Sequence, residues 1–137
     1  METEERRMQN GSMQRTNDLL DRTKQFALAT IRFWEGLPKD ETSRVLGRQL
    51  SALAHRLERT TAPPIGQSPK PSKADFISKM GTVLEEADES TYWIELLSDA
   101  GKVDASQSDP LYREANELVA IAVSSIKTAR RTSQVYQ

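Results

Sequence analysis

The sequence predicts an all-α protein, an antiparallel up-and-down four-helix bundle. Apolar residues recur three and four positions apart in four segments, which is the spacing of one helix face. No segment alternates apolar and polar residues between turn signals, so no strand is predicted. Helices joined by short connections pack antiparallel, and the first and third connections are short. A chain of 137 residues is close to the commonest size of one domain, so we expect a single core.

The first helix is expected at about residues 17–37, after a flexible polar arm at residues 1–16. Its apolar residues cover about 160° of the helix surface, wider than one seam needs. They form two adjacent stripes: Leu20, Ala27, Ile31 and Trp34, and Leu19, Phe26, Phe33 and Leu37. Either this arc rests on both neighbouring helices of one bundle, or part of it contacts another subunit. Gly36 and Pro38 should end the helix.

The second helix is expected at about residues 41–60, with Asp40 as its N-cap. A narrow apolar seam is formed by leucines spaced four, three and four apart: Leu46, Leu50, Leu53 and Leu57. Basic residues lie on the opposite side, within about 60° of one another. They are Arg44, Arg48, His55 and Arg59. A basic stripe therefore backs an apolar one.

A proline-rich loop is expected at about residues 61–71, because four prolines there exclude a helix. The third helix follows at about 72–101. Its predicted buried face is Phe76, Met80, Val83, Ala87, Ile94 and Leu97, and its outward carboxylates are Glu85, Asp88, Glu95 and Asp99. Tyr92 should also point outward, beside Trp93. The helices before and after the loop need one another to bury their seams, so the loop does not separate two domains.

The fourth helix is expected at about residues 109–132, opened by Asp109 and Pro110, and followed by a tail at 133–137. Its predicted apolar face is Leu111, Ala115, Leu118, Ala122, Ile126 and Ala129. Lys127, Arg130 and Arg131 complement the negative end of the helix dipole. Gly47 and Gly81 lie inside helices two and three. Each is either a point of close approach between these helices or a tolerated surface glycine.

The residue types argue against catalysis. There is no cysteine and one histidine, His55, and no Glu-x-x-His pair of the kind found in di-iron bundles. The sequence has no serine on a strand-to-helix turn and no glycine-rich phosphate loop. We therefore expect no enzyme activity, no metal and no cofactor. Without an apolar run long enough for a bilayer or a signal peptide, the chain is expected in the cytoplasm.

Three segments resemble a known family: "VLGRQL" at 45–50, "DFISKMGTVLEEADESTYWIELLSDAGKV" at 75–103 and "LVAIAVSSIKTARR" at 118–131. They are similar to the bacterial four-helix-bundle family named for reading frames in intervening sequences of 23S ribosomal RNA genes. The resemblance covers nearly all of residues 18–131, and "EEADESTYWIELL" is its most specific part. The chain departs from the family at "ALAHRLERTTAPPIGQSPKP", where relatives usually carry a small-residue turn.

The resemblance implies a bundle that assembles into a ring, usually a homopentamer, without enzymatic activity. It also implies kinship with the accessory variability protein of diversity-generating retroelements, which binds a reverse transcriptase and nucleic acid. The residues predicted to bind RNA or DNA are Arg44, Arg48, His55, Arg59, Lys127, Arg130 and Arg131. The residues predicted at the oligomer interface are Phe26, Phe33, Leu37, Tyr92 and Trp93.

Two functions follow. The first is a cytoplasmic, non-catalytic oligomeric adaptor that serves a reverse transcriptase and its nucleic acid. The alternative is a structural or protein-interaction scaffold that does not bind nucleic acid and contacts its partner through the proline-rich loop. A charged stripe is often just a solvated helix face, and it could equally pair with the acidic face of a neighbouring subunit. The 19 basic and 20 acidic residues nearly balance, so net charge does not decide between the two.

Overall fold

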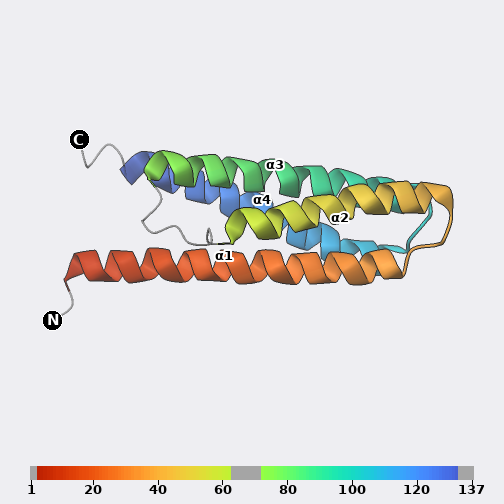
Figure 1. Ribbon diagram of the computed structural model, residues 1–137, viewed down its shortest axis with the longest axis horizontal. Helices are drawn as coiled ribbons and strands as arrows, with labels where there is room; N and C mark the ends of the chain where they lie inside the picture. The colour runs from red at the N-terminus through yellow and green to blue at the C-terminus, as the bar shows by residue number, and fades with distance from the viewer. Residues whose placement is uncertain (1–2, 63–71, 133–137) are drawn as a thin grey trace.

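The computed structural model describes residues 3–62 and 72–132, with the backbone alone for residues 5–17 and 132. Within these ranges the chain forms four α-helices: α1 (Glu4–Glu35), α2 (Glu41–Thr61), α3 (Lys73–Asp99) and α4 (Ala105–Thr132). Figure 1 shows an elongated bundle whose α1–α2 and α3–α4 connections lie at the same end. The antiparallel up-and-down arrangement expected from the sequence is therefore confirmed.

The four helices close into a bundle with one open side. Each helix packs against its neighbours in sequence, and α1 also meets α4. The contact between α3 and α4 is the most extensive of these, and the contact between α1 and α4 is the smallest. Across the described residues, α2 and α4 lie diagonally, with no pair of their Cα atoms within 8 Å. Of the four seams between neighbouring helices, the one between α1 and α4 is therefore the least tightly packed.

Asp40 caps α2 as expected. Its carboxylate accepts hydrogen bonds from the backbone N–H of Ser43 at 3.0 Å and from the Ser43 hydroxyl at 2.9 Å. The Nζ of Lys102, beyond the end of α3, lies 3.3 Å from Asp40 Oδ1. The backbone bond first, then the hydroxyl and Lys102, lower the pKa of Asp40 from the ordinary 3.8 to about 2. At α3, Ser72 and Asp75 form a capping box.

The start of α1 corrects the expected boundary. The helix begins at Glu4, whereas a polar arm was expected up to residue 16. That expectation rested on the lack of an apolar face, but a helix also forms where propensity is favourable. Glu, Arg, Met and Gln dominate residues 4–16, and no proline interrupts them. Residues 1–2, most of the proline-rich loop (63–71) and the tail at 133–137 lie outside the described residues.

The start of α4 also differs from the expectation. The helix begins at Ala105, so Asp109 and Pro110 lie inside it and do not open it. Asp104 precedes the first turn, and its carbonyl accepts hydrogen bonds from the N–H groups of Gln107 and Ser108. Pro110 lacks the N–H that would bond to the carbonyl of Ser106. Because Ser106 is exposed, water can take the place of that donor.

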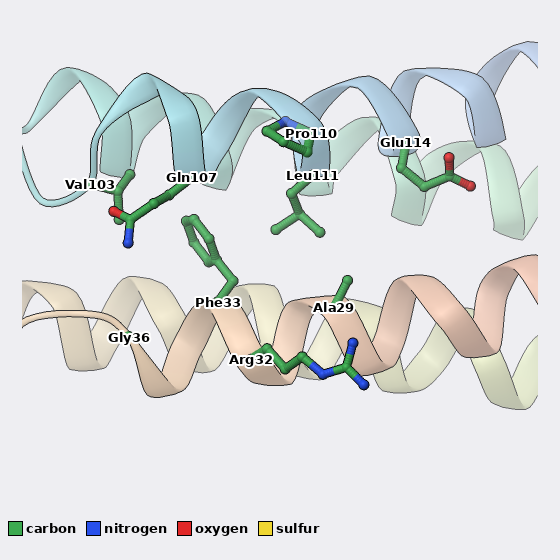
Figure 2. Close-up of a pocket in the computed structure, with 9 residues that line it drawn as sticks. All are labelled: Ala29, Arg32, Phe33, Gly36, Val103, Gln107, Pro110, Leu111 and Glu114. Carbon is green, nitrogen blue, oxygen red and sulfur yellow. The ribbon is translucent and has the colours of Figure 1, made fainter.

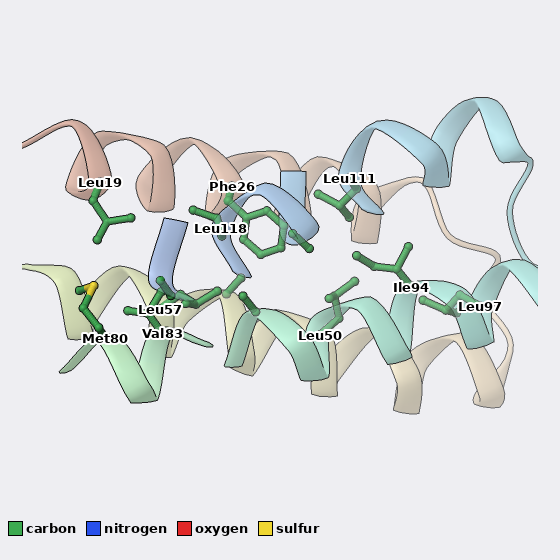
Figure 3. Packing of buried hydrophobic residues seen from close by; sticks show 14 of the residues in the cluster. Leu19, Phe26, Leu50, Leu57, Met80, Val83, Ile94, Leu97, Leu111 and Leu118 are labelled. Carbon is green, nitrogen blue, oxygen red and sulfur yellow. The ribbon is translucent and has the colours of Figure 1, made fainter. Parts of the chain in front are cut away.

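The core follows the predicted seams closely. Leu50, Leu53 and Leu57 of α2 are fully buried, together with Val83 of α3 and Leu118 of α4. Figure 3 shows these side chains, apart from Leu53, meeting others from all four helices. Leu46, Phe76 and Ile126, expected in the core, are half-buried and pack against it. The buried hydroxyls of α1 are satisfied: Thr30 donates to the Phe26 carbonyl at 2.8 Å, and Thr23 pairs with Thr61 at 2.6 Å.

The two helical glycines behave differently. A Cβ on Gly47 would lie 2.7 Å from Nε1 of Trp34 and 3.1 Å from Cδ1 of Leu37, so this glycine is a point of close approach. Its partner is α1 and not α3, which corrects half of the expectation. A Cβ on Gly81 would meet nothing within 4 Å, so close approach is wrong for that position.

Candidate functional site

The arginine row, defined as Arg44, Arg48, His55 and Arg59, lies on the solvent side of α2, and all four residues are exposed. The guanidinium of Arg44 is 3.6 Å from the carboxylate of Glu41, but both groups are well exposed and such pairs are weak. In the described part of the chain, no ion pair or hydrogen bond engages the other three side chains. At 1.5 Å per residue the row extends for about 22 Å.

The tryptophan flank, defined as Leu28, Ile31 and Trp34, is an exposed apolar strip on α1. Ile31 is 45% exposed and Trp34 43%, so the neighbouring helices leave this part of the apolar arc largely uncovered. The apolar arc of α1 is wider than the surface that α2 and α4 cover, so its outer part stays in solvent. The excess width of the arc was the signal in the sequence. It did not say which residues would remain uncovered.

The second basic group, Lys127, Arg130 and Arg131, lies exposed at the carboxyl end of α4. Because α2 and α4 lie diagonally across the bundle in the described ranges, this group and the arginine row lie on helices that are not adjacent. A single straight nucleic-acid strand on the face of α2 would therefore meet only the arginine row. The two groups are separate candidates and need separate variants.

The outer face of α3 is acidic, as predicted. Glu85, Asp88, Glu95 and Asp99 are exposed, and Tyr92 among them is 55% exposed. The Tyr92 ring packs edge-on against Trp93, with centroids 5.0 Å apart. Trp93 is half-buried against the core. Tyr92 is thus an exposed aromatic side chain held in place by a second aromatic ring.

Between α2 and α3 lies a partly buried ion pair. Arg56 Nε is 3.6 Å from Oε1 of Glu86, and the other carboxylate oxygen, Oε2, is buried without a hydrogen-bond partner among the described residues. Burial raises the pKa of Glu86, against the opposing attraction of Arg56. The pair joins α2 to α3. Arg56 is therefore engaged with α3, unlike the arginine row.

The predicted oligomer interface needs correction at two positions. Phe26 is 1% exposed and Leu37 is 8% exposed, because both belong to the core of the bundle itself. Neither can contact another subunit in this fold. Phe33 is half-buried on the α4 side of α1, and Trp93 is half-buried on α3. Of the five predicted residues, Tyr92 offers the most surface to a partner.

An open groove of about 330 Å³ lies between α1 and α4. Figure 2 shows Phe33 and Ala29 of α1 pointing toward α4, where Leu111 faces them. The lining residues are Ala29, Arg32, Phe33, Gly36, Val103, Gln107, Pro110, Leu111 and Glu114. Glu114, which lines the groove, forms a two-pronged ion pair with Arg22, with N–O distances of 3.1 Å. None of the predicted nucleic-acid residues lines this groove.

The described residues show neither a cluster of metal ligands nor a membrane-spanning helix. They contain no group of three or more His, Cys, Asp or Glu side chains that could hold a metal ion. No helix in the described ranges combines the length and apolar character required to cross a membrane. His55, the single histidine of the sequence, is exposed on the arginine row.

Comparison with known proteins gives a match in structure. No protein-family model and no curated protein matches the sequence. A solved structure from Bacteroides thetaiotaomicron, described as a protein with unknown function from the S23 ribosomal protein family, aligns with a TM-score of 0.71. The two sequences are 24% identical, and the alignment covers 82% of this chain and 98% of the other. The chain therefore shares its four-helix bundle fold with a member of the S23 ribosomal protein family.

Proposed function

We propose that the chain is a non-catalytic, oligomeric adaptor of the S23 family that binds nucleic acid through the arginine row. The exposure of that row carries the proposal: about 22 Å of basic side chains, of which Arg48, His55 and Arg59 have no partner in the described ranges. Guanidinium groups bind phosphates with two parallel hydrogen bonds. A row of this length could contact several successive phosphates of one strand.

Family membership is supported by the matching fold together with the resemblance at residues 45–50, 75–103 and 118–131. The resemblance also supplies the protein partner, a reverse transcriptase that the adaptor would serve in the cytoplasm as part of a retroelement. It further supplies the assembly, a ring of five subunits. The exposed Tyr92, held against Trp93, supports a subunit contact on the outer face of α3.

Binding of fluorescent RNA and DNA at several salt concentrations tests the proposal. The variant with Arg44, Arg48 and Arg59 changed to Glu should lose binding, and the wild type should bind less tightly as salt rises. Arg48→Glu and Arg113→Glu form a matched pair, because both remove one exposed arginine and only the first belongs to the arginine row. Equal effects of these two changes would contradict the proposal, as would absence of wild-type binding at low salt.

The second candidate function is a protein-interaction scaffold that does not touch nucleic acid. One observation favours it: Tyr92 and the tryptophan flank expose large apolar side chains on two sides of the bundle. In that case the arginine row would contact acidic groups of a protein, such as those on α3 of another subunit. Sedimentation of the arginine variant separates the two, because the scaffold predicts loss of the oligomer and the adaptor predicts an intact one.

A further inference from the structure

The side chain of Trp34 packs against the surface of α2 at Gly47. Gly47 is buried and leaves no room for a Cβ, because the edge of the Trp34 ring lies directly against its backbone. Trp34 is nevertheless 43% exposed. A tryptophan that only filled space in the core would be covered by both helices. Trp34 contacts α2 along one edge of its ring and leaves a large part of its surface in solvent.

The contact between Trp34 and Gly47 lies beside the arginine row. Arg44 is three residues before Gly47, and residues at this spacing are neighbours on a helix surface, about 5–6 Å apart at Cβ. Arg48 follows Gly47 directly in the chain. Gly47, against which the indole packs, is therefore a surface neighbour of Arg44, and Arg48 lies one turn after Arg44 on the same row. Ile31, one turn earlier on α1, continues the apolar surface.

Aromatic rings beside a row of cations are the usual elements of single-strand binding sites. The cations follow the phosphates, and each ring stacks on a base, which every base permits because it has a flat face. A duplex keeps its bases stacked on one another, so Trp34 could not reach them. An acidic protein would satisfy the arginines but would not specifically require a flat ring at position 34. The combination favours single-stranded nucleic acid.

We propose that Trp34 is a stacking platform for one base of a single-stranded RNA or DNA, with Arg44 and Arg48 on the phosphates next to that base. This inference rests on the proposed function and sharpens it. It assigns the ligand as a single strand, and it assigns the discrimination between single strand and duplex to a residue of α1. The arginine row supplies affinity for both forms, and Trp34 adds affinity for the unpaired form alone.

The test compares Trp34→Leu with Trp34→Phe. Both side chains keep apolar cover over Gly47, but only phenylalanine keeps a ring that stacks. The probes are an oligothymidylate, an unstructured RNA and a DNA duplex of the same length. Trp34→Leu should weaken binding of both single strands by about tenfold. Trp34→Phe should retain most of the single-strand affinity, and neither change should alter duplex binding.

Fluorescence gives a second readout that does not depend on a Trp34 variant. In a Trp93→Phe background, Trp34 is the remaining tryptophan, and stacking on a base should quench its emission when the single strand is added. Thermal unfolding of each variant confirms that the bundle is intact. The combination of quenching and selective loss in Trp34→Leu supports the inference.

Other outcomes overturn the inference in distinguishable ways. Unchanged single-strand affinity in Trp34→Leu, with binding still lost in the arginine variant, removes the stacking platform and leaves the proposed function standing. Absence of any binding by the wild type removes both. Emission that changes with protein concentration and not with nucleic acid would assign Trp34 to a protein contact.

Discussion

The α3–α4 pair and the α1–α2 pair bury their surfaces in different ways. The α3–α4 contact is the most extensive in the bundle, and both helices carry fully buried residues: Val83 and Ala87 on α3, and Leu118 and Ala122 on α4. The side of α1 that faces the bundle buries hydroxyls, at Thr23 and Thr30, alongside Phe26, while its outer apolar side chains stay in solvent. The comparison teaches that a helix can complete the core with one face and still leave a broad apolar surface in solvent, as α1 does.

The largest expected effect comes from comparing the variants Leu118→Ala and Ile31→Ala. Leu118 is fully buried, so its truncation should lower the free energy of unfolding by about 2–5 kcal/mol through lost burial and the cavity that remains. Ile31 is 45% exposed, and its truncation should cost less than about 1 kcal/mol. Urea unfolding of the two variants measures both losses. Comparable losses would show that the tryptophan flank is covered in solution.

The next effect concerns the two helical glycines. Replacement by alanine should change the stability of the protein in opposite directions at the two positions. Gly47→Ala should destabilise the protein by about 1–3 kcal/mol, because its Cβ would displace the Trp34 ring and press on Leu37. Gly81→Ala should stabilise it by about 0.5–1 kcal/mol, since alanine is the better helix former and nothing obstructs its Cβ. Thermal unfolding distinguishes the two. A stabilising Gly47→Ala would mean that Trp34 does not rest on α2.

The smallest effect concerns Asp40, at the closed end of the α1–α2 pair. Its pKa is lowered to about 2 in the folded state, so the stability that its charge contributes is complete above the ordinary pKa of 3.8. That contribution is lost as the pH falls from 3.8 towards 2. Asp40→Asn keeps the cap but removes the charge, so its melting temperature should be lower by a few degrees at neutral pH and less sensitive to acid.

Melting temperatures followed by circular dichroism across this pH window test the assignment. Asp88→Asn is the matched control, because it removes one carboxylate charge from an exposed position outside any helix cap. The control should keep the acid sensitivity that Asp40 confers. If Asp40→Asn and wild type lost stability in parallel between these pH values, the cap would not be responsible for the pKa of Asp40.

Periodicity predicted the fold and most of the core because it depends on which face of each helix is apolar. It placed Leu50, Val83, Ile94 and Leu118 correctly, since each lies at the centre of its face. It did not decide whether Ile31 and Trp34, which lie at the edge of a wide arc, would be covered. Whether an edge residue is covered depends on how closely the neighbouring helices approach, and the spacing of residues within one helix does not contain that distance.

The candidate site was also predicted only in part, because periodicity describes one helix at a time. The exposure of the arginine row follows from its position opposite the leucine seam, which one helix alone determines. The contact between Trp34 and Gly47 depends on how α1 and α2 align along their axes. That alignment is fixed by pairs of residues far apart in sequence, such as Thr23 with Thr61. Gly47 indicated a close approach, but the sequence could not name the side chain that approaches it.

The contact between Trp34 and Gly47 also constrains how this sequence can evolve. While Trp34 is present, alanine at position 47 carries a cost; once a smaller side chain occupies position 34, the same alanine gains the helix propensity that glycine lacks. The effect of one substitution thus changes sign with the other, so the order in which they arise matters. Lineages that keep the tryptophan should keep the glycine, and lineages that lose the tryptophan should lose the glycine soon afterwards.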